Sequence, residues 1–380
     1  MDPVQLFIPT FRIEETLEEI RICLEKGWTG LGFKTIEFEE AWKAYTGLPY
    51  AHFLNSATAA LHLAVIMLKE QGGWKEGDEI ITTPLTFVSS NHAILYEKLK
   101  PVFADVDEML CLDPESVQER ITDKTRAVMF VGVGGNTGRL KKIVKLCKKY
   151  NLKLILDASH MSGTRWADTG IHIGREADVT IFSFQAVKNL PTGDSGMICL
   201  HDSELDAEVR QWSWLGINKD TYARTVSQAN YKWFYDVEYT GFKYNGNSIM
   251  AAMALVSLRY LEQDNAYRRQ VCAWYDMMLR DSKIIERIPM SADCIPSRHM
   301  YQISVAHRDE VMLALNQVNI FPGVHYRDNT LYRMYAFGQG TCPRSMAASD
   351  RIISLPLHLR LTYDQVEYVC NNLKQIMAIM

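Results

Sequence analysis

The chain has 380 residues, of which 47% are hydrophobic, and it carries a formal net charge of −4. This composition supports a large core, and nothing in the slightly acidic charge balance suggests a surface that binds nucleic acid or an anionic membrane. No apolar run approaches the roughly 18–20 residues that span a bilayer, and residues 1–20 lack the basic and apolar stretches of a signal peptide, so we expect none.

Residues up to about 245 alternate short apolar runs with longer amphipathic ones, which is typical of a mostly parallel sheet covered by helices. The first predicted strand begins near Glu79, after the turn segment GGWKEGD. The predicted strands are, in chain order, EIITTPLTF, KPVFADV, RAVMFVGV, KLILDAS, DVTIFSF and SGMICLH. The predicted helices between them are TAALHLAVIMLKEQ, SSNHAILYEKL and GRLKKIVKLCKKY. This order predicts an α/β fold.

The pattern of the chain changes after about Tyr244. The predicted elements there are one or two long helices over 247–279, a strand at 300–307, and helices at 308–317 and 362–377. We therefore predict a large α/β domain over residues 1–245 that binds a cofactor, and a smaller C-terminal α+β domain over residues 246–380. No internal repeat or low-complexity linker separates the two parts.

Eight cysteines are scattered along the chain, and no two of them form a CxxC pair. This spacing disfavours both a metal cluster and a disulfide framework. We therefore expect reduced, mostly buried thiols in a cytoplasmic protein, and no metal site.

Ligands of open α/β sheets bind where the strands end, so residues at these positions are the first candidates for a site. Ser56, Ala57 and Thr58 stand at the start of a predicted helix, whose exposed backbone N–H groups can bind a phosphate. The same residues also make an ordinary helix cap, and taken alone they favour that interpretation. Phe87 follows a strand and could stack on a planar ring, although a core phenylalanine is the more common role.

Asp157 ends a strongly apolar strand, and His160 follows it three residues later. A carboxylate at this position could keep a pyridine nitrogen protonated through a charge-assisted hydrogen bond. Capping of the following segment is an equally good explanation of Asp157. His160 could contact the same ring or be a polar residue with its hydrogen bonds satisfied.

Lys188 is the one lysine of the segment FSFQAVKNLPTGDSGM, which follows a buried strand. A lysine in a partly apolar site can lose its proton and form a Schiff base with a carbonyl, whereas an isolated lysine usually lies at the surface. Ser183, five residues earlier, can offer a hydroxyl to a phosphate. A phosphate cap, a stacking ring, a carboxylate and this lysine occur in order, and together they meet the needs of pyridoxal phosphate (PLP).

Two glycine-rich segments do not form a nucleotide-binding motif. VGVGGNTG, at 131–138, lacks the GxGxxG order of a first βα unit and the GK[ST] of a P-loop. We interpret it as a permissive loop near the cofactor or substrate, and GWTGLG, at 27–32, as a turn that lines a pocket.

These segments resemble the DegT/StrS family of sugar-nucleotide aminotransferases, which are fold-type I enzymes dependent on PLP. The resemblance covers nearly the whole length, and its most specific segments are NSATAALHLAV, LDASHMSG, FSFQAVKNLPTGDSG, GFKYNGNSIMAA and GVHYRD. It implies the fold-type I architecture, with a mostly parallel central sheet and a smaller C-terminal domain. It also implies PLP as the cofactor and a homodimer with shared active sites.

The resemblance assigns a role to each matching residue. Lys188 would bind the cofactor and move protons, and Asp157 would face the pyridine nitrogen. Phe87 would stack on the ring, and His160 would lie near its phenolate oxygen. The phosphate would be held by Ala57, Thr58, Ala59 and Ser183 of one subunit and by Lys243 or Asn245 of its neighbour. The sugar-nucleotide pocket would include Trp28, His325, Tyr326 and Arg327.

The sequence departs from the family pattern at three places. The differing segments are Gly193-Asp194-Ser195-Gly196 for the common Gly-Glu-Gly-Gly, Lys243-Tyr244-Asn245 for Asn-Tyr-Arg, and Arg327-Asp328 where Pro often follows the His-Tyr pair. Because these places lie near the substrate and the phosphate, they leave the sugar, the nucleotide and the aminated carbon open. A lysine at 188 argues against the subgroup of the family that has histidine there and catalyses a dehydration.

We therefore predict transfer of an amino group from an amino acid, with L-glutamate expected, to a keto-sugar nucleotide. The product would be an amino-deoxy sugar for a surface polysaccharide or glycoconjugate. Two alternatives remain: a PLP enzyme of another reaction type, such as a decarboxylase, and a non-catalytic ligand-binding regulator of the same fold. Release of a keto acid from glutamate would favour transamination, and the absence of a cofactor absorbance band would favour the regulator.

Overall fold

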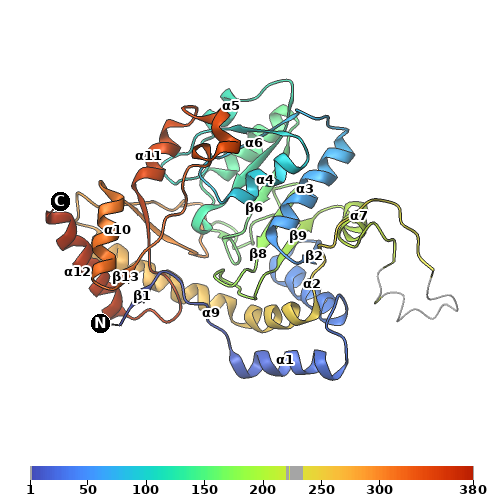
Figure 1. The fold of residues 1–380 in the computed structure, drawn as a ribbon, viewed down its shortest axis with the longest axis horizontal. Coiled ribbons are helices and arrows are strands. Elements are labelled where there is room, and N and C mark those ends of the chain that lie inside the picture. The colour runs from blue at the N-terminus through green and yellow to red at the C-terminus, as the bar shows by residue number, and fades with distance from the viewer. Residues whose placement is uncertain (1, 220–221, 223–233, 380) are drawn as a thin grey trace.

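The computed structural model describes residues 2–219, 222 and 234–379 (Figure 1). The strands are β1 (Val4–Gln5), β2 (Tyr50–Leu54), β3 (Glu79–Thr82), β4 (Lys100–Phe103), β5 (Thr125–Val131), β6 (Lys153–Asp157), β7 (Arg165–Trp166), β8 (Val179–Ser183), β9 (Gly196–Leu200), β10 (Glu286–Arg287), β11 (Cys294–Ile295), β12 (Tyr301–Ser304), β13 (Ile320–Phe321) and β14 (Ile352–Leu355). The α-helices are α1 (Ile13–Glu25), α2 (Phe33–Thr46), α3 (Ala57–Gly72), α4 (Val88–Tyr96), α5 (Pro114–Glu119), α6 (Leu140–Tyr150), α7 (Ser203–Ser213), α9 (Ser248–Leu279), α10 (Arg308–Gln317), α11 (Pro343–Arg351) and α12 (Tyr363–Ile379). Three short 3-10 helices cover Val133–Gly135, Asn329–Leu331 and Arg333–Gly338.

Seven strands form the central sheet in the order β2-β9-β8-β6-β5-β3-β4. The neighbouring pairs from β8 to β4 are all parallel, whereas β9 runs antiparallel to both β2 and β8. Asp157, the last residue of β6, is in register with Ile181 of β8, and Ser183 ends β8 two residues further on. The topology therefore brings two of the predicted cofactor residues to one edge of the sheet.

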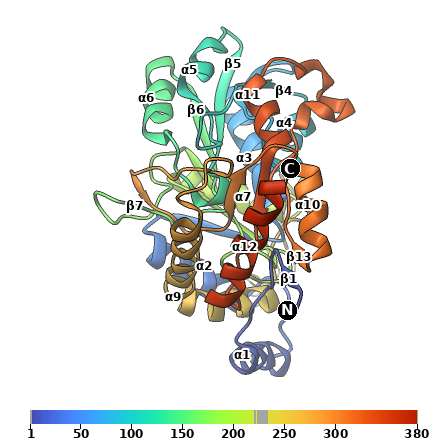
Figure 2. The ribbon, with the colours of Figure 1, turned by 90° about the vertical axis from the view of Figure 1, so that its left-hand side faces the viewer.

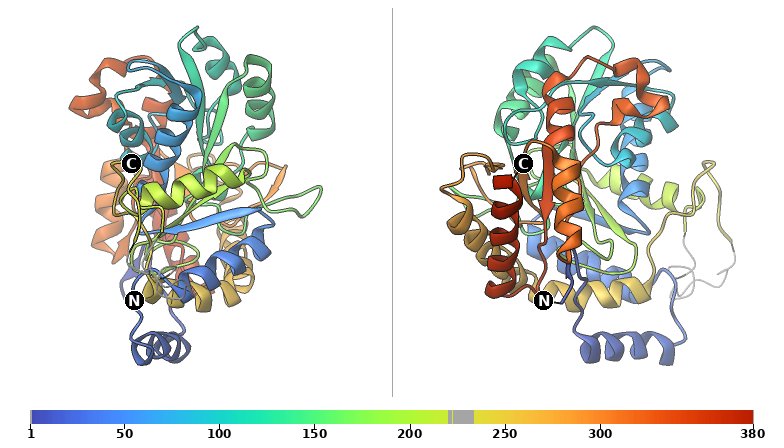
Figure 3. Two further views of the ribbon diagram at one scale, coloured as in Figure 1. Left: turned by 90° about the vertical axis from the view of Figure 1, so that its right-hand side faces the viewer. Right: turned by 60° about the vertical axis from the view of Figure 1, so that its left-hand side comes forward.

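Each face of the sheet carries its own core because side chains alternate along the strands. On β6, Leu154 and Leu156 belong to the core on one face and Ile155 to the core on the other. Helices α2, α6 and α9 contribute to the first core, and α3, α4 and α7 contribute to the second (Figures 1 and 3). The sheet is thus covered by helices on both sides.

A smaller unit follows the long helix α9. Strands β10, β12 and β14 form a three-stranded antiparallel sheet, and the second half of α9 packs on it together with α10 and α12. Val4 of β1 joins this core by pairing with Ile320, so both ends of the chain lie on the side of α10 and α12 (Figures 1 and 2). The predicted domain division between residues 1–245 and 246–380 stays a prediction.

The predicted fold class is confirmed by the mostly parallel sheet and its helical layers. Strand β3 begins at Glu79, as the turn signal predicts, and the apolar segment 247–279 forms one helix, α9. Strand β2, which lies at the edge of the sheet, is not predicted from the sequence. Its segment YAHFL is only five residues long and lacks a clear alternation of apolar and polar residues, so the strand pattern is weak.

All eight cysteines are buried and unpaired. Burial raises the pKa of the Cys147 thiol to about 12, so this thiol stays protonated at neutral pH. Within the described part of the chain, no helix is both long enough and apolar enough to cross a bilayer.

Candidate active site

A cavity of about 620 Å³ opens where the strands of the central sheet end. Its walls come from the start of α3, the segment before α4, the ends of β6 and β8, the loop after β8, and the segment that follows β13. The predicted residues that line it are Ala57, Thr58, Phe87, Asp157, His160, Ser183, Lys188, His325, Tyr326 and Arg327. The fold thus brings together ten residues that are spread over most of the sequence.

The start of α3 offers backbone N–H groups to the cavity. Ser56 caps the helix, and its Oγ accepts a hydrogen bond from the amide of Ala59 at 3.1 Å. The amides of Ala57 and Thr58 belong to the first turn, where no intrahelical carbonyl is available to them. Ala57 and Thr58 line the cavity, whereas the amide of Ala59 is already used by the cap.

Gly196 lets this helix start approach the sheet closely. A Cβ atom at Gly196 would lie 2.5 Å from the Ala57 nitrogen and 2.6 Å from the carbonyl carbon of Ser56. Any other residue at this position would therefore push the helix start away from β9. The need for a glycine here explains the last residue of the Gly-Asp-Ser-Gly segment.

Asp157 is held in place by two serines. Its Oδ2 accepts a hydrogen bond from Ser90 Oγ at 2.8 Å. Its Oδ1 accepts from the amide of Ser159 at 3.1 Å and from the hydroxyl of Ser159 at 2.6 Å. The side chain is 4% exposed, so the carboxylate is a fixed, buried negative charge facing the cavity. Neither serine is predicted from the sequence, although Ser159 follows Asp157 at the spacing of an Asx turn.

Lys188 lies in the loop between β8 and β9. Its amide donates to the carbonyl of Gln185 at 2.8 Å, and the next residue, Asn189, donates to the carbonyl of Ser297 at 2.8 Å. Burial lowers the pKa of the Lys188 amine to about 8, and the negative charge of Asp157 only partly offsets this effect. A useful fraction of the amine is therefore neutral, and nucleophilic, near physiological pH.

His160 and Tyr326 form a directed hydrogen bond at the cavity wall. The amide of Gly134 donates to Nδ1 of His160 at 3.3 Å, and Nε2 of His160 lies 3.0 Å from the Tyr326 hydroxyl oxygen. Burial, followed by the charge of Lys188, lowers the pKa of His160 well below its usual value, so the ring is neutral. Because Nδ1 accepts, the ring proton is on Nε2 and Tyr326 accepts it. The hydroxyl hydrogen of Tyr326 is then free to serve a group in the cavity.

Three further predicted residues stand around the mouth of the cavity. The Phe87 side chain is 58% exposed, and its ring lies 6.3 Å from that of Tyr326. Arg327 holds its guanidinium 5.3 Å from the ring centre of Tyr332. His325 shares a hydrogen bond of 2.9 Å with Ser354, and burial lowers its pKa to about 4, so it is neutral at pH 7.

Trp28, Lys243 and Asn245 do not line this cavity in their own chain. Trp28 donates from its indole nitrogen to the carbonyl of Leu31 at 2.8 Å. Lys243 holds its amine 3.0 Å from the ring centre of Trp214, and Asn245 forms an isolated bridge with Leu54 of β2. Their predicted contact with the site of a neighbouring subunit stays a prediction.

The model of the DegT/DnrJ/EryC1/StrS aminotransferase family matches residues 11–374. The chain belongs to this family. The sugar aminotransferase assignment and its PLP dependence, both expected from the sequence, are therefore confirmed.

Relatives of this sugar aminotransferase match along nearly their whole length. The chain is 32% identical over 375 residues to the spore coat polysaccharide biosynthesis protein SpsC of Bacillus subtilis, with 96% of this chain and 94% of SpsC covered. It is 31% identical over 386 residues to an uncharacterized protein of Methanocaldococcus jannaschii, with 98% of both chains covered. These matches include the segments that form the cavity.

Solved structures agree with the fold of the sugar aminotransferase. The aminotransferase TlmJ from Streptoalloteichus hindustanus superposes with a TM-score of 0.90 at 27% identity and 99% coverage of both chains. A putative sugar aminotransferase from Streptococcus pneumoniae, solved in its PLP form, gives a TM-score of 0.88 at 26% identity, again with 99% of both chains covered.

Proposed function

We propose that this aminotransferase moves an amino group from L-glutamate to a keto-sugar linked to a nucleotide, and so supplies an amino-deoxy sugar for a surface polysaccharide or glycoconjugate. The observation that carries the proposal is that Lys188 and Asp157 line one cavity together with the free amides of α3. The volume of that cavity is in the range that small-molecule sites occupy. The similarity to SpsC, a protein named for spore coat polysaccharide biosynthesis, supports the polysaccharide role.

The residues of the cavity fit PLP. The amides of Ala57 and Thr58, with the hydroxyl of Ser183, would hold the phosphate. Asp157, which Ser90 and Ser159 fix in place, would keep the pyridine nitrogen protonated. When bound, PLP supplies the electron sink for the bond-breaking step.

Lys188 would be the proton carrier of both half-reactions. Its amine has a pKa of about 8, so it can accept a proton at neutral pH and also return one. In the first half-reaction Nζ would take a proton from the carbon that bears the amino group of glutamate, and in the second it would deliver a proton to the sugar carbon. Phe87 would cover one face of the ring and restrict the approach of water.

His325, Tyr326 and Arg327 would bind the substrates. Tyr326 has a hydroxyl hydrogen to donate, and His325 is neutral. Arg327 forms no ion pair with any carboxylate in the described ranges and packs over Tyr332 instead. Its guanidinium could bind the diphosphate of the sugar nucleotide or the carboxylate of glutamate in a bidentate manner.

The working unit would be a homodimer in which each subunit completes the site of the other. Lys243, Asn245 and Trp28 lie outside the cavity of their own chain. Leu215, whose amide donates to the carbonyl of Phe242, is an exposed apolar side chain. Mixing two inactive variants, Lys188→Ala and the double variant Lys243→Ala/Asn245→Ala, tests this arrangement. Mixed dimers would contain one intact site and regain activity, whereas a mixture that stays inactive would contradict shared sites.

A cytoplasmic location is supported by the eight buried, unpaired cysteines, because thiols stay reduced in that compartment. The formal net charge of −4 supports small-molecule partners rather than nucleic acid or membrane.

Product analysis by mass spectrometry tests the proposed reaction. The purified enzyme would be incubated with ¹⁵N-labelled glutamate and a panel of keto-sugar nucleotides, and the label should appear on one sugar. The Lys188→Ala variant should lose turnover and the absorbance of bound PLP. Loss of carbon dioxide from the donor without labelled sugar would instead indicate another PLP reaction, and retained turnover in the variant would contradict the role of Lys188.

A further inference from the structure

Strand β2 is the edge strand of the central sheet, and its outer side is covered by side chains and, at its end, by the main chain of residues 244–246. On one side β2 pairs with β9 (Figure 3), and along its other side the described chain has no strand but only the isolated bridge between Leu54 and Asn245. Arg210 of α7 donates to the carbonyl of Ala51 at 3.0 Å, and Glu39 of α2 accepts from the amide of Phe53 at 2.8 Å. Two side chains thus satisfy backbone groups that a further strand would otherwise bind.

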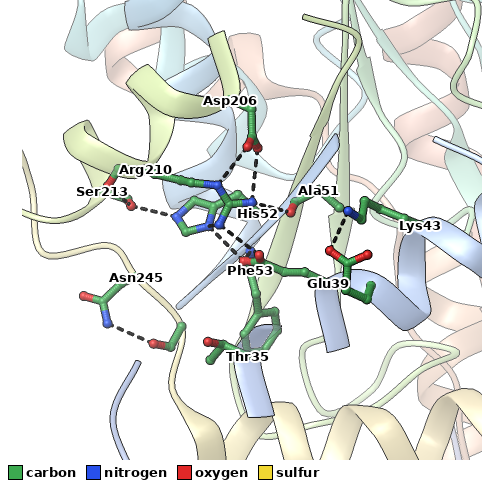
Figure 4. Close-up of polar contacts among 12 residues, drawn as sticks. Thr35, Glu39, Lys43, Ala51, His52, Phe53, Asp206, Arg210, Ser213 and Asn245 are labelled. Carbon is green, nitrogen blue, oxygen red and sulfur yellow. Dashed lines mark hydrogen bonds and ion pairs between the residues drawn. The ribbon is translucent and has the colours of Figure 1, made fainter. Parts of the chain in front are cut away.

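The two side chains are themselves held in a network in which Glu39 and His52 are buried and Arg210 is half-buried (Figure 4). Arg210 Nη1 lies 2.9 Å from Glu39 Oε2, and Arg210 also binds Asp206 at 2.8 Å. His52 lies 2.9 Å from Glu39 Oε1 with one ring nitrogen and 2.7 Å from Ser213 Oγ with the other. Burial of Glu39 alone would raise its pKa, but Arg210 and His52 outweigh that effect and lower it, so Glu39 stays ionised. The position of β2 is therefore fixed between two helices.

The fixed strand leads directly into the helix start at the cavity. Leu54 ends β2, and only Asn55 and the cap Ser56 separate it from α3. Leu54 is in register with Gly196, which has no room for a side chain against the Ala57 amide. Because this contact is tight, a small shift of β2 moves the amides of the helix start relative to the rest of the cavity.

We infer that Glu39 and Arg210 are positioning residues for the start of α3, whose backbone amides would hold the cofactor phosphate. Neither side chain lines the active-site cavity, so they act through β2. Asp157 and Lys188, at the ring end of the cavity, are carried by β6 and by the loop after β8. A displacement of β2 should therefore weaken the binding of the phosphate and leave the contacts of Asp157 and Lys188 with the cofactor ring unchanged. The inference rests on the proposed binding of PLP in this cavity.

The test compares two ligands that differ only in the phosphate. The dissociation constants of PLP and of pyridoxal are measured by absorbance on the wild-type protein and on Glu39→Gln. The variant should lose about tenfold in PLP affinity, which corresponds to one charge-assisted hydrogen bond. Its affinity for pyridoxal should stay at the wild-type value, because pyridoxal places nothing at the helix start.

Glu40→Gln is the matched control, because Glu40 is the next residue of the same helix and pairs with Lys43 at 2.6 Å instead of with β2. It should bind both ligands like the wild type. Arg210→Lys is the second variant, in case Glu39→Gln does not fold. It keeps the positive charge but loses the fork that reaches Ala51, Glu39 and Asp206 together, so it should show the same PLP-specific loss.

Equal losses for PLP and pyridoxal would overturn the inference, because they would indicate general damage to the fold. Unchanged affinity for both ligands in both variants would overturn it as well. A wild-type protein that binds no PLP would instead contradict the proposed function, so the two failures can be told apart.

Discussion

The hydroxyl oxygen of Tyr326 accepts a hydrogen bond from Nε2 of His160 across 3.0 Å. The direction of this bond is set on the far side of the imidazole, where the amide of Gly134 donates to Nδ1. A glycine in the loop VGVGGNTG therefore fixes the tautomer of His160, and this leaves the hydroxyl hydrogen of Tyr326 available to a group in the cavity. Gly134 has a φ of +64°, a conformation that glycine adopts without strain.

Tyr326→Phe should lower kcat/KM by about tenfold, because it removes one hydrogen-bond donor from the cavity. Because His160 donates to the Tyr326 hydroxyl oxygen, we expect the double variant Tyr326→Phe/His160→Asn to be no worse than Tyr326→Phe alone. Steady-state kinetics on the two single variants and the double variant measure this coupling. Additive losses would mean that His160 acts on the cofactor or substrate independently of Tyr326.

The capture of PLP by the cofactor-free enzyme should depend on pH through Lys188. Burial lowers the pKa of its amine to about 8, and only the neutral amine attacks the aldehyde. The rate should therefore rise about fivefold from pH 7 to pH 8 and about tenfold in all, and it should level off above about pH 9. Stopped-flow absorbance measures it. A rate that continues to rise toward pH 10 would show that the amine keeps its ordinary pKa.

Asp157→Asn should reduce kcat by roughly 10²-fold or more, because a neutral amide cannot keep the pyridine nitrogen protonated. PLP methylated on that nitrogen carries a permanent charge, so it should restore part of the activity to the variant. Ser90→Ala, which removes the hydrogen bond to Oδ2 and the 3.1 Å contact with Thr86 Oγ1 but keeps the carboxylate, should lose much less. Activity assays after reconstitution with each cofactor distinguish these outcomes, and the absence of rescue would assign Asp157 a purely structural role.

Gly196→Ala should weaken PLP binding and cost about 1–3 kcal/mol of stability, because the new Cβ would lie 2.5 Å from the Ala57 nitrogen. Gly193→Ala is the control in the same segment, since its Cβ would meet only the flexible side chain of Met250 at 3.3 Å. Thermal unfolding and PLP titration compare the two variants. Similar behaviour of both would show that the close approach at Gly196 is unimportant.

The sequence by itself determined the α/β class and six of the seven strands of the central sheet, because these depend on local apolar patterns. It also predicted Asp157 and Lys188 as site residues, because each is an ionisable side chain at or after the end of an apolar strand, where α/β sheets bind ligands. Ten of its fourteen candidate site residues line one cavity in the structure.

Only the tertiary structure decided what depends on contacts between distant segments. Ser90 donates to Asp157, which is 67 residues away in the sequence. Gly134 donates to Nδ1 of His160, 26 residues away, and so fixes the tautomer of that ring. Strand β2 has a weak pattern of its own, and it is held at the sheet edge by Glu39 and Arg210, which lie on two helices. Such contacts leave no local signal because hydrogen-bond partners are chosen by three-dimensional proximity, whereas periodicity in a sequence reports only which face of an element is buried.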